Sequence, residues 1–478
     1  MTSRRRILFV AMQDSIHVAR WIDMIADRGW ELNFFPIHGN EPNPDLRGVR
    51  LHVPALLATP YDGGVPWPVS PVPPTFKRIV RFANIGLEDP AEAARLLLNR
   101  MRRGSQSLRD RLASRQPNKP FKETPVSGGA AQCLAFHPTI EDLGGPEALA
   151  VGLVRLGESI NAAPILHGPG ALVALIRQLQ PDLVHSMEFQ HAGYLVLRAK
   201  EMLGSGFPPW LATNWGSDIF YFQRFADHRA QITRLLGSID YYSCECTRDI
   251  AIARSLGYTG KTLPVLPNSG GFRLDRLAPL RSPDPPSKRK LIMVKGYDHF
   301  AGRGMIALQV IERMQERLHG YKIVLFSVSA EPRKRALELK EMGILDIKVI
   351  DWATHEGILS HFGCARIYMA VSISDGISTS SLEAMAMGAF PIQTNTSCCD
   401  EWFRDCEGGF IIPPDDVDVI CDRFQRALED DELVDRAAMI NAVTVRERLD
   451  RNIIVPKVGA FYDEVFSSGP LANRFPRH

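Results

Sequence analysis

Short apolar runs alternate with stretches of helical periodicity along this chain, and the alternation occurs twice. Residues 6–12 form an apolar run that predicts a buried strand, residues 15–29 carry apolar side chains at helical spacing, and residues 31–39 predict a second strand. The same alternation returns between residues 291 and 394. Strand, helix and strand in this order are typical of a parallel sheet covered by helices on both faces. We therefore predict an α/β chain with two Rossmann-like domains built on parallel sheets.

The length of the chain agrees with two domains. Its 478 residues exceed what one hydrophobic core usually organises. We expect an N-terminal domain over residues 1–275, a linker rich in proline and charge over 276–287, and a C-terminal domain over 288–451. Residues 452–478 begin with the pattern of a final helix.

An irregular Pro/Arg-rich insertion is expected around residues 55–165. Residues 60–74 contain six prolines, which excludes a central strand or a helix interior there. Residues 75–122 carry twelve basic and four acidic side chains among apolar ones. Such a segment can lie on an anionic membrane. The alternative is a solvated basic helix whose apolar residues pack into the first domain, and the sequence leaves both open.

The overall charge and the cysteines exclude several classes of protein. Lys and Arg number 56 against 54 Asp and Glu, so the net charge of +2 favours no nucleic-acid partner. The apolar runs are far shorter than the ~20 residues that cross a bilayer. Eight cysteines without a paired C-x-x-C motif are typical of a reducing compartment, so we expect a cytoplasmic protein without a structural metal.

The most informative segment is residues 365–388, where an apolar strand ends in a loop of small residues that opens into a helix. A helix start of this kind points backbone N–H groups at an anion such as a diphosphate. Asp375 precedes the helix and Glu383 follows eight residues later, so both carboxylates can flank one ligand. The expected donor-binding residues are Glu383, Gly376, Ile377, Ser378, Thr379, Ser380 and Ser381. The alternative is that the serines cap the helix and that Glu383 only favours its dipole.

The string DGISTSSLEAMAMGAFPIQT, residues 375–394, resembles the E-x7-E signature of family 4 retaining glycosyltransferases (glycosyl transferases group 1), with Asp375 in place of the first Glu. The resemblance extends through PDLVHSMEF, TNWGSD, PNSGG and residues 408–430. It implies the GT-B fold, in which two facing Rossmann-like domains leave an interdomain cleft. It also implies that the final helix returns to the N-terminal, acceptor-side domain, while the C-terminal domain binds the donor.

The resemblance assigns a role to each of these residues. Glu383 would hold the ribose hydroxyls of the donor, and Asp375 would face its sugar. Two cations would reach the donor phosphates from the loop VKGYDHFAGRG, residues 294–304, and the matching positions are Arg303 and Lys295. The catalytic residues expected are thus Asp375, Arg303 and Lys295, although a solvated surface position for either cation stays open.

Four residues of the N-terminal half are candidates for the acceptor or sugar side. They are His17, Asp218, Glu188 and His185. His185 and Glu188 end a predicted strand, at the sheet edge where open α/β folds bind ligands. Trp215 stands where many relatives carry a His, whereas Asp218 keeps its place in their pattern. The alternative is a structural role for the two histidines and for Glu188.

The function expected from this resemblance is metal-independent, retaining transfer of a sugar from a nucleoside diphosphate sugar to a hydroxyl acceptor, in bacterial-type polysaccharide or glycolipid synthesis. The acceptor would be lipid-linked or a growing glycan, met at the inner face of the membrane. No cofactor and no metal are expected. A sugar-nucleotide epimerase and an inactive binding module stay open as alternatives, whereas the lack of G-x-G-x-x-G after the first strand argues against an NAD enzyme.

Overall fold

The computed structural model describes residues 5–37, 40–54, 129–136 and 168–468. The chain divides into two compact units, Met1–Ser186 with His191–Pro209, and Met187–Gln190 with Trp210–His478. Strands β1 to β5 pair in parallel in the first unit, and in the second unit β6 to β8 and β9 to β14 form two further sets of parallel pairs. The predicted α/β fold with parallel sheets is therefore confirmed.

Strands of the first unit follow the order β4-β3-β2-β1-β5. Their bounds are β1 (Arg6–Ala11), β2 (Glu31–Pro36), β3 (Arg50–Pro54), β4 (Gln132–Phe136) and β5 (Leu183–Met187). Ile7 of β1 pairs with Leu32 on one side and with Leu183 on the other. Such a central strand is covered on both faces, which explains its continuous apolar run.

Among the described residues of this unit, the α-helices are α1 (Ile16–Asp23), α5 (Pro169–Leu179) and α6 (Tyr194–Leu203). Helix α1 ends at Asp23, six residues before the predicted end at Gly29, and turns follow it. Strand β4 falls inside the segment expected to be an irregular insertion. The rest of that segment, including the basic residues 75–122, lies outside the described residues.

The second unit contains β6 (Trp210–Thr213), β7 (Tyr241–Ser243) and β8 (Lys261–Thr262), which pair in that order. Helices α7 (Ser217–Phe220), α8 (Ala226–Leu236) and α9 (Thr247–Ser255) connect these strands, and α10 (Leu274–Leu277) follows. The final helix, α17 (Arg451–Ser468), lies against this sheet. Tyr241 Oη donates to the carbonyl of Val465 at 3.1 Å, and Lys261 pairs with Glu464 at 2.8 Å.

A six-stranded sheet with the order β11-β10-β9-β12-β13-β14 forms the rest of the second unit. Its strands are β9 (Leu291–Lys295), β10 (Lys322–Phe326), β11 (Asp346–Val349), β12 (Ile367–Ala370), β13 (Phe390–Thr394) and β14 (Phe410–Ile412). The chain runs outward from β9 to β11 and then starts again on the other side of β9 with β12. Loops that leave β9 and β12 therefore diverge, and such a switch point is where open α/β sheets bind ligands.

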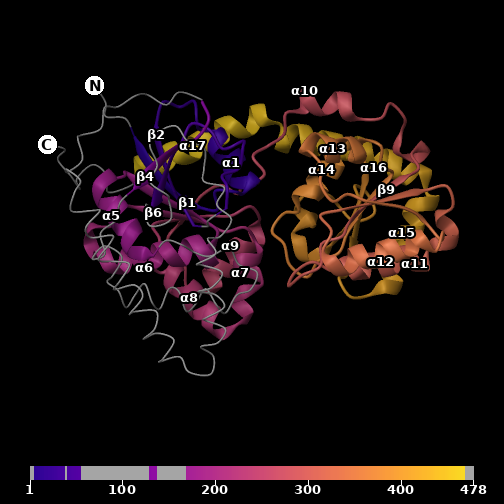
Figure 1. Ribbon diagram of the computed structural model, residues 1–478, viewed down its shortest axis with the longest axis horizontal. Coiled ribbons are helices and arrows are strands. Elements are labelled where there is room, and N and C mark those ends of the chain that lie inside the picture. The colour runs from indigo at the N-terminus through magenta and orange to yellow at the C-terminus, as the bar shows by residue number, and fades with distance from the viewer. Residues whose placement is uncertain (1–4, 38–39, 55–128, 137–167, 469–478) are drawn as a thin grey trace, which may run out of the picture. The chain divides into compact units, whose positions relative to one another are not determined.

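Helices cover both faces of the six-stranded sheet (Figure 1). Helices α11 (Gly304–Arg313), α12 (Ala330–Glu341) and α15 (Val417–Glu429) pack on one face, with Leu308, Leu339 and Phe424 in one apolar core. Helices α13 (His355–Gly363), α14 (Thr379–Met387) and α16 (Asp431–Leu449) pack on the other, with Phe362 and Met385 in a second core. Among the described residues, no helix combines the length and apolar character that crossing a membrane requires.

Candidate active site

Two loops meet at the switch point of the six-stranded sheet. The loop after β9 and the loop after β12 are joined by backbone hydrogen bonds from Arg303 N to Val371 O at 2.9 Å and from Ile373 N to Ala301 O at 2.8 Å. Together they line a cavity of about 200 Å³. Its lining residues are Ser217, Lys295, Tyr297, His299, Phe300, Ala301, Gly302, Ala370, Val371, Ser372, Ser374, Asp375, Ser378 and Gln393. Of the three predicted catalytic residues, the cavity thus brings together Lys295 and Asp375.

Asp375 is held in a fixed loop before α14. Its Oδ1 accepts the N–H of Gly376 at 2.9 Å, and its carbonyl accepts Arg248 Nη2 at 2.8 Å. Arg248 Nη1 also donates to the carbonyl of Thr396 at 2.9 Å, so one guanidinium joins the loops after β12 and β13. Ser378 precedes the helix with extended backbone but makes no side-chain cap. Ser378 therefore does not cap the helix with its side chain, contrary to the alternative considered for this serine.

Glu245, which was not among the residues predicted from the sequence, is hydrogen-bonded to this loop. Its Oε1 accepts the N–H of Ile377 at 3.0 Å, and its Oε2 accepts the N–H of Asn268 at 3.3 Å. A Cβ on Gly376 would collide with the same carboxyl group, which explains the glycine. Burial raises the pKa of Glu245 from 4.5 to about 8. The amide of Ile377, expected to face a phosphate, therefore binds a protein carboxyl group in this structure.

Glu383 projects from α14 and is 6% exposed. Its Oε1 lies 2.6 Å from Nε2 of His355, the first residue of α13. Thr354 accepts the N–H of Gly357 at 3.1 Å and so fixes the helix start that carries this histidine. The sequence offered only a lone histidine after a capping threonine, which is too common a pattern to identify a site. Glu383, Thr379, Ser380 and Ser381 do not line the cavity.

The two predicted cations differ in their surroundings. Lys295 ends β9 and reaches the cavity, with its Nζ 5.8 Å from the ring centroid of Tyr297. Arg303 is the residue before α11, and its Nη1 donates to the carbonyls of His299 at 3.0 Å and of Gly302 at 2.7 Å. Arg303 does not line the cavity, so its observed contacts hold the loop in shape.

The candidates of the N-terminal half are mostly buried. Burial lowers the pKa of His185 from 6.5 to about 3, and its ring lies 5.4 Å from that of Phe9, so it is a neutral packing residue of β5. His17 is the second residue of α1 and is half-buried.

Asp218 and Glu188 shape the backbone around β6. Asp218 accepts the N–H groups of Trp215 at 2.8 Å and of Phe189 at 3.1 Å, while Glu188 accepts the N–H of Gln190 at 2.5 Å. Burial, together with the negative charge of Glu188, raises the pKa of Asp218 well above its ordinary value. These contacts describe a buried network that supports the loop after β6.

One cluster of possible metal ligands is present in the described part of the chain. Cys246, Cys398 and Glu401 bring two sulfur atoms and a carboxylate oxygen within 4.8 Å of one another. The carboxylate of Glu401 already accepts hydrogen bonds from the N–H and the Oγ1–H of Thr247, both at 2.7 Å. The hydrogen bond with Cys398, together with burial, raises the pKa of the Cys246 thiol. The carboxylate and the thiol therefore already have protein partners in this structure.

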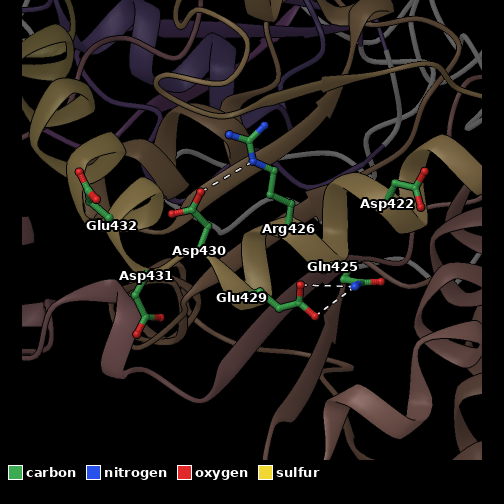
Figure 2. A pocket seen from close by; sticks show the side chains of 7 residues that line it. All are labelled: Asp422, Gln425, Arg426, Glu429, Asp430, Asp431 and Glu432. Carbon is green, nitrogen blue, oxygen red and sulfur yellow. Dashed lines mark hydrogen bonds and ion pairs between the residues drawn. The ribbon is translucent and has the colours of Figure 1, made fainter.

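A larger hollow of about 610 Å³ lies where α15 meets α16 (Figure 2). Its lining residues are Asp422, Gln425, Arg426, Glu429, Asp430, Asp431 and Glu432. Nε of Arg426 lies 3.7 Å from Oδ2 of Asp430, and Nε2 of Gln425 donates to Oε1 of Glu429 at 3.1 Å. Since five of the seven lining side chains are carboxylates, this hollow would repel a phosphate group. The smaller cavity is therefore the candidate active site.

Comparisons with known proteins relate the chain to glycosyltransferase families. Residues 290–430 match the family described as Glycosyl transferases group 1, and residues 162–242 match Glycosyl transferase 4-like. The chain resembles sucrose-phosphate synthase from Thermosynechococcus elongatus at 13% identity, with 98% of this chain and 100% of that one covered and a TM-score of 0.59. These matches support a glycosyltransferase of the GT-B type. A search of curated proteins found no match.

Two further solved structures share the fold of this chain. Trehalose 6-phosphate synthase from Burkholderia multivorans has 14% identity, 100% coverage of both chains and a TM-score of 0.58. HepE from Anabaena, in complex with UDP and glucose, has 11% identity, covers 96% of this chain and 100% of its own, and has a TM-score of 0.57. The group 1 match includes both loops of the candidate site.

Proposed function

We propose that this chain transfers a sugar from a nucleoside diphosphate sugar to a hydroxyl acceptor, with retention of the anomeric configuration and without a metal ion. The observation that carries the proposal is the cavity at the switch point, where Asp375 and Lys295 converge within the group 1 match. HepE structures with UDP and with UDP-glucose support a nucleotide sugar as the donor. Residues 288–451 would bind this donor, and residues 1–275 would bind the acceptor.

The proposed reaction breaks the bond between the sugar C1 and the leaving phosphate oxygen, and forms a bond from C1 to the acceptor oxygen. The acceptor's proton passes to the departing phosphate, so no protein base is required. Lys295 would stabilise the negative charge that develops on this phosphate. Arg303 would support the same step through the loop that its guanidinium holds.

Asp375 would orient the donor sugar. Its Oδ1 already binds the N–H of Gly376, which leaves Oδ2 for a sugar hydroxyl. A hydrogen bond from a hydroxyl to a carboxylate is among the stronger kinds in proteins. Because the loop is held by Arg248, this carboxylate would keep its position when the donor binds.

The acceptor is proposed to be lipid-linked or a growing glycan at the inner face of a membrane. This part of the proposal depends on the basic residues 75–122, outside the described residues. Sedimentation with anionic vesicles at low salt should pellet the protein, and changing Lys77, Arg78 and Arg81 to Glu should abolish this. Equal sedimentation of both proteins would contradict the membrane contact.

The proposed activity is tested by incubating the protein with a panel of nucleoside diphosphate sugars, with and without added acceptors. Acceptor-dependent release of nucleoside diphosphate is expected, and proton NMR of the product should show the donor's anomeric configuration. Asp375→Ala and Lys295→Ala should each lower the turnover at least tenfold, and EDTA should leave it unchanged. Isomerised donor released without an acceptor would instead identify an epimerase, and binding without turnover would identify an inactive module.

A further inference from the structure

His299 lies in the loop after β9 and lines the same cavity as Lys295 and Asp375. Its ring centroid is 3.7 Å from that of Tyr297, edge-on, and 4.7 Å from that of Phe300. The two aromatic neighbours restrict the orientation of the imidazole. No role for this residue follows from the sequence motifs.

The hydrogen bonds of the imidazole define its tautomer. Nδ1 accepts the N–H of Ala301 at 2.9 Å, and the N–H of Gly302 lies 3.5 Å from it. A ring nitrogen that accepts carries no proton, so the proton of the neutral ring is on Nε2. Burial, Lys295 and Arg303 lower the pKa of His299, against the opposing effect of Asp298 and Asp375, which favours this neutral form near pH 7.

The other ring nitrogen has no partner in the part of the chain that the structure describes. Nε2 is buried, and its N–H donates no hydrogen bond there. A buried donor without an acceptor is rare in native proteins, because it has lost its bonds to water. His299 lines the cavity, so a ligand oxygen that reaches Nε2 would complete this bond.

We propose that His299, through Nε2–H, donates a hydrogen bond to a diphosphate oxygen of the bound nucleotide sugar. This inference rests on the proposed function. With Nδ1 occupied by Ala301, the ring can donate and cannot accept, so it selects an acceptor oxygen. Lys295 on the same wall provides the positive charge that such an anion requires. His299 thus binds substrate, whereas Arg303 holds the loop.

Two substitutions separate binding to the ligand from support of the loop. His299→Asn places an amide oxygen near the position of Nδ1, so it preserves the bond to Ala301 and removes Nε2–H. His299→Gln places an amide N–H near the position of Nε2, so it preserves the donor and removes the acceptor for Ala301. Each variant therefore retains one of the two contacts.

The measurements are calorimetric titrations of both variants and the wild type with UDP and UDP-glucose, together with thermal unfolding. We expect His299→Asn to weaken UDP binding about tenfold with an unchanged melting temperature. His299→Gln should bind UDP within about threefold of the wild type but melt at a lower temperature.

The opposite pattern, with UDP binding intact in His299→Asn, would overturn the inference and leave the proposed function in place. A loss seen with UDP-glucose and not with UDP would overturn the assignment to the diphosphate. If the wild-type protein bound neither UDP nor the GDP, ADP and dTDP of a control panel, the proposed function would fail, and this inference with it.

Discussion

Replacing Glu383 by Ala tests the proposed contact between α14 and the donor ribose most directly. Glu383 is buried, its Oε1 is bonded to His355, and Oε2 has no hydrogen bond within the described residues. If this carboxylate binds a ribose hydroxyl, the substitution removes a hydrogen bond to a charged group, about 1.5–3 kcal/mol. Binding of the nucleotide should therefore weaken roughly 10- to 150-fold.

A comparison of UDP with 2′-deoxy-UDP isolates the ribose contact. The wild-type protein should prefer UDP, because the missing hydroxyl leaves the carboxylate without its partner. Glu383→Ala should bind the two nucleotides equally in calorimetric titrations. His355→Ala is the matched control, since it disrupts the same ion pair but keeps the carboxylate, and it should keep the preference for UDP.

The reasoning would be refuted by a Glu383→Ala protein that retains the wild-type preference for UDP over 2′-deoxy-UDP. Thermal unfolding accompanies each titration. A variant that melts much earlier and loses affinity for both nucleotides in equal proportion would indicate that Glu383 serves the packing of α14 against α13.

Three other perturbations follow from the loop contacts. Gly376→Ala should destabilise the protein by about 1–3 kcal/mol in thermal unfolding, and this loss should be smaller in a Glu245→Ala background; an equal loss in both backgrounds would contradict the clash. Because the folded-state pKa of Glu245 is raised from 4.5 to about 8, the folded protein keeps an extra proton between these values, so stability should fall as pH rises through this window. In urea unfolding, the stability of Glu245→Gln should not fall in this way between these pH values. An equal fall in this variant would refute the assignment of the pH dependence to Glu245. Arg303→Ala should lower the turnover and should also lower the free energy of unfolding by about 1.5–3 kcal/mol, because the bonds to the carbonyls of His299 and Gly302 are lost. An unchanged melting temperature would contradict the observed contacts.

The sequence by itself determined the layers of the fold and the position of the candidate site along the chain. Continuous apolar runs at β1, β9 and β12 predict strands buried on both faces, because local periodicity reports which sides of an element avoid water. The small residues between β12 and α14 predict a loop that opens a helix, since backbone conformation there depends on neighbouring residues. Strand β4 (QCLAF) escaped this reasoning although four of its five residues are apolar, because the proline-rich stretch before it favoured an irregular insertion over the whole segment.

Only the tertiary structure decided which groups meet in the site. Glu245 and the amide of Ile377 are 132 positions apart, and His355 is 28 positions from Glu383, so no local pattern links them. The direction of the Arg303 guanidinium and the tautomer of His299 likewise depend on carbonyl and N–H groups that the folded loop presents. Side-chain partners are chosen by the packing of distant segments, because a polar group that leaves water must bond to whatever the fold places beside it.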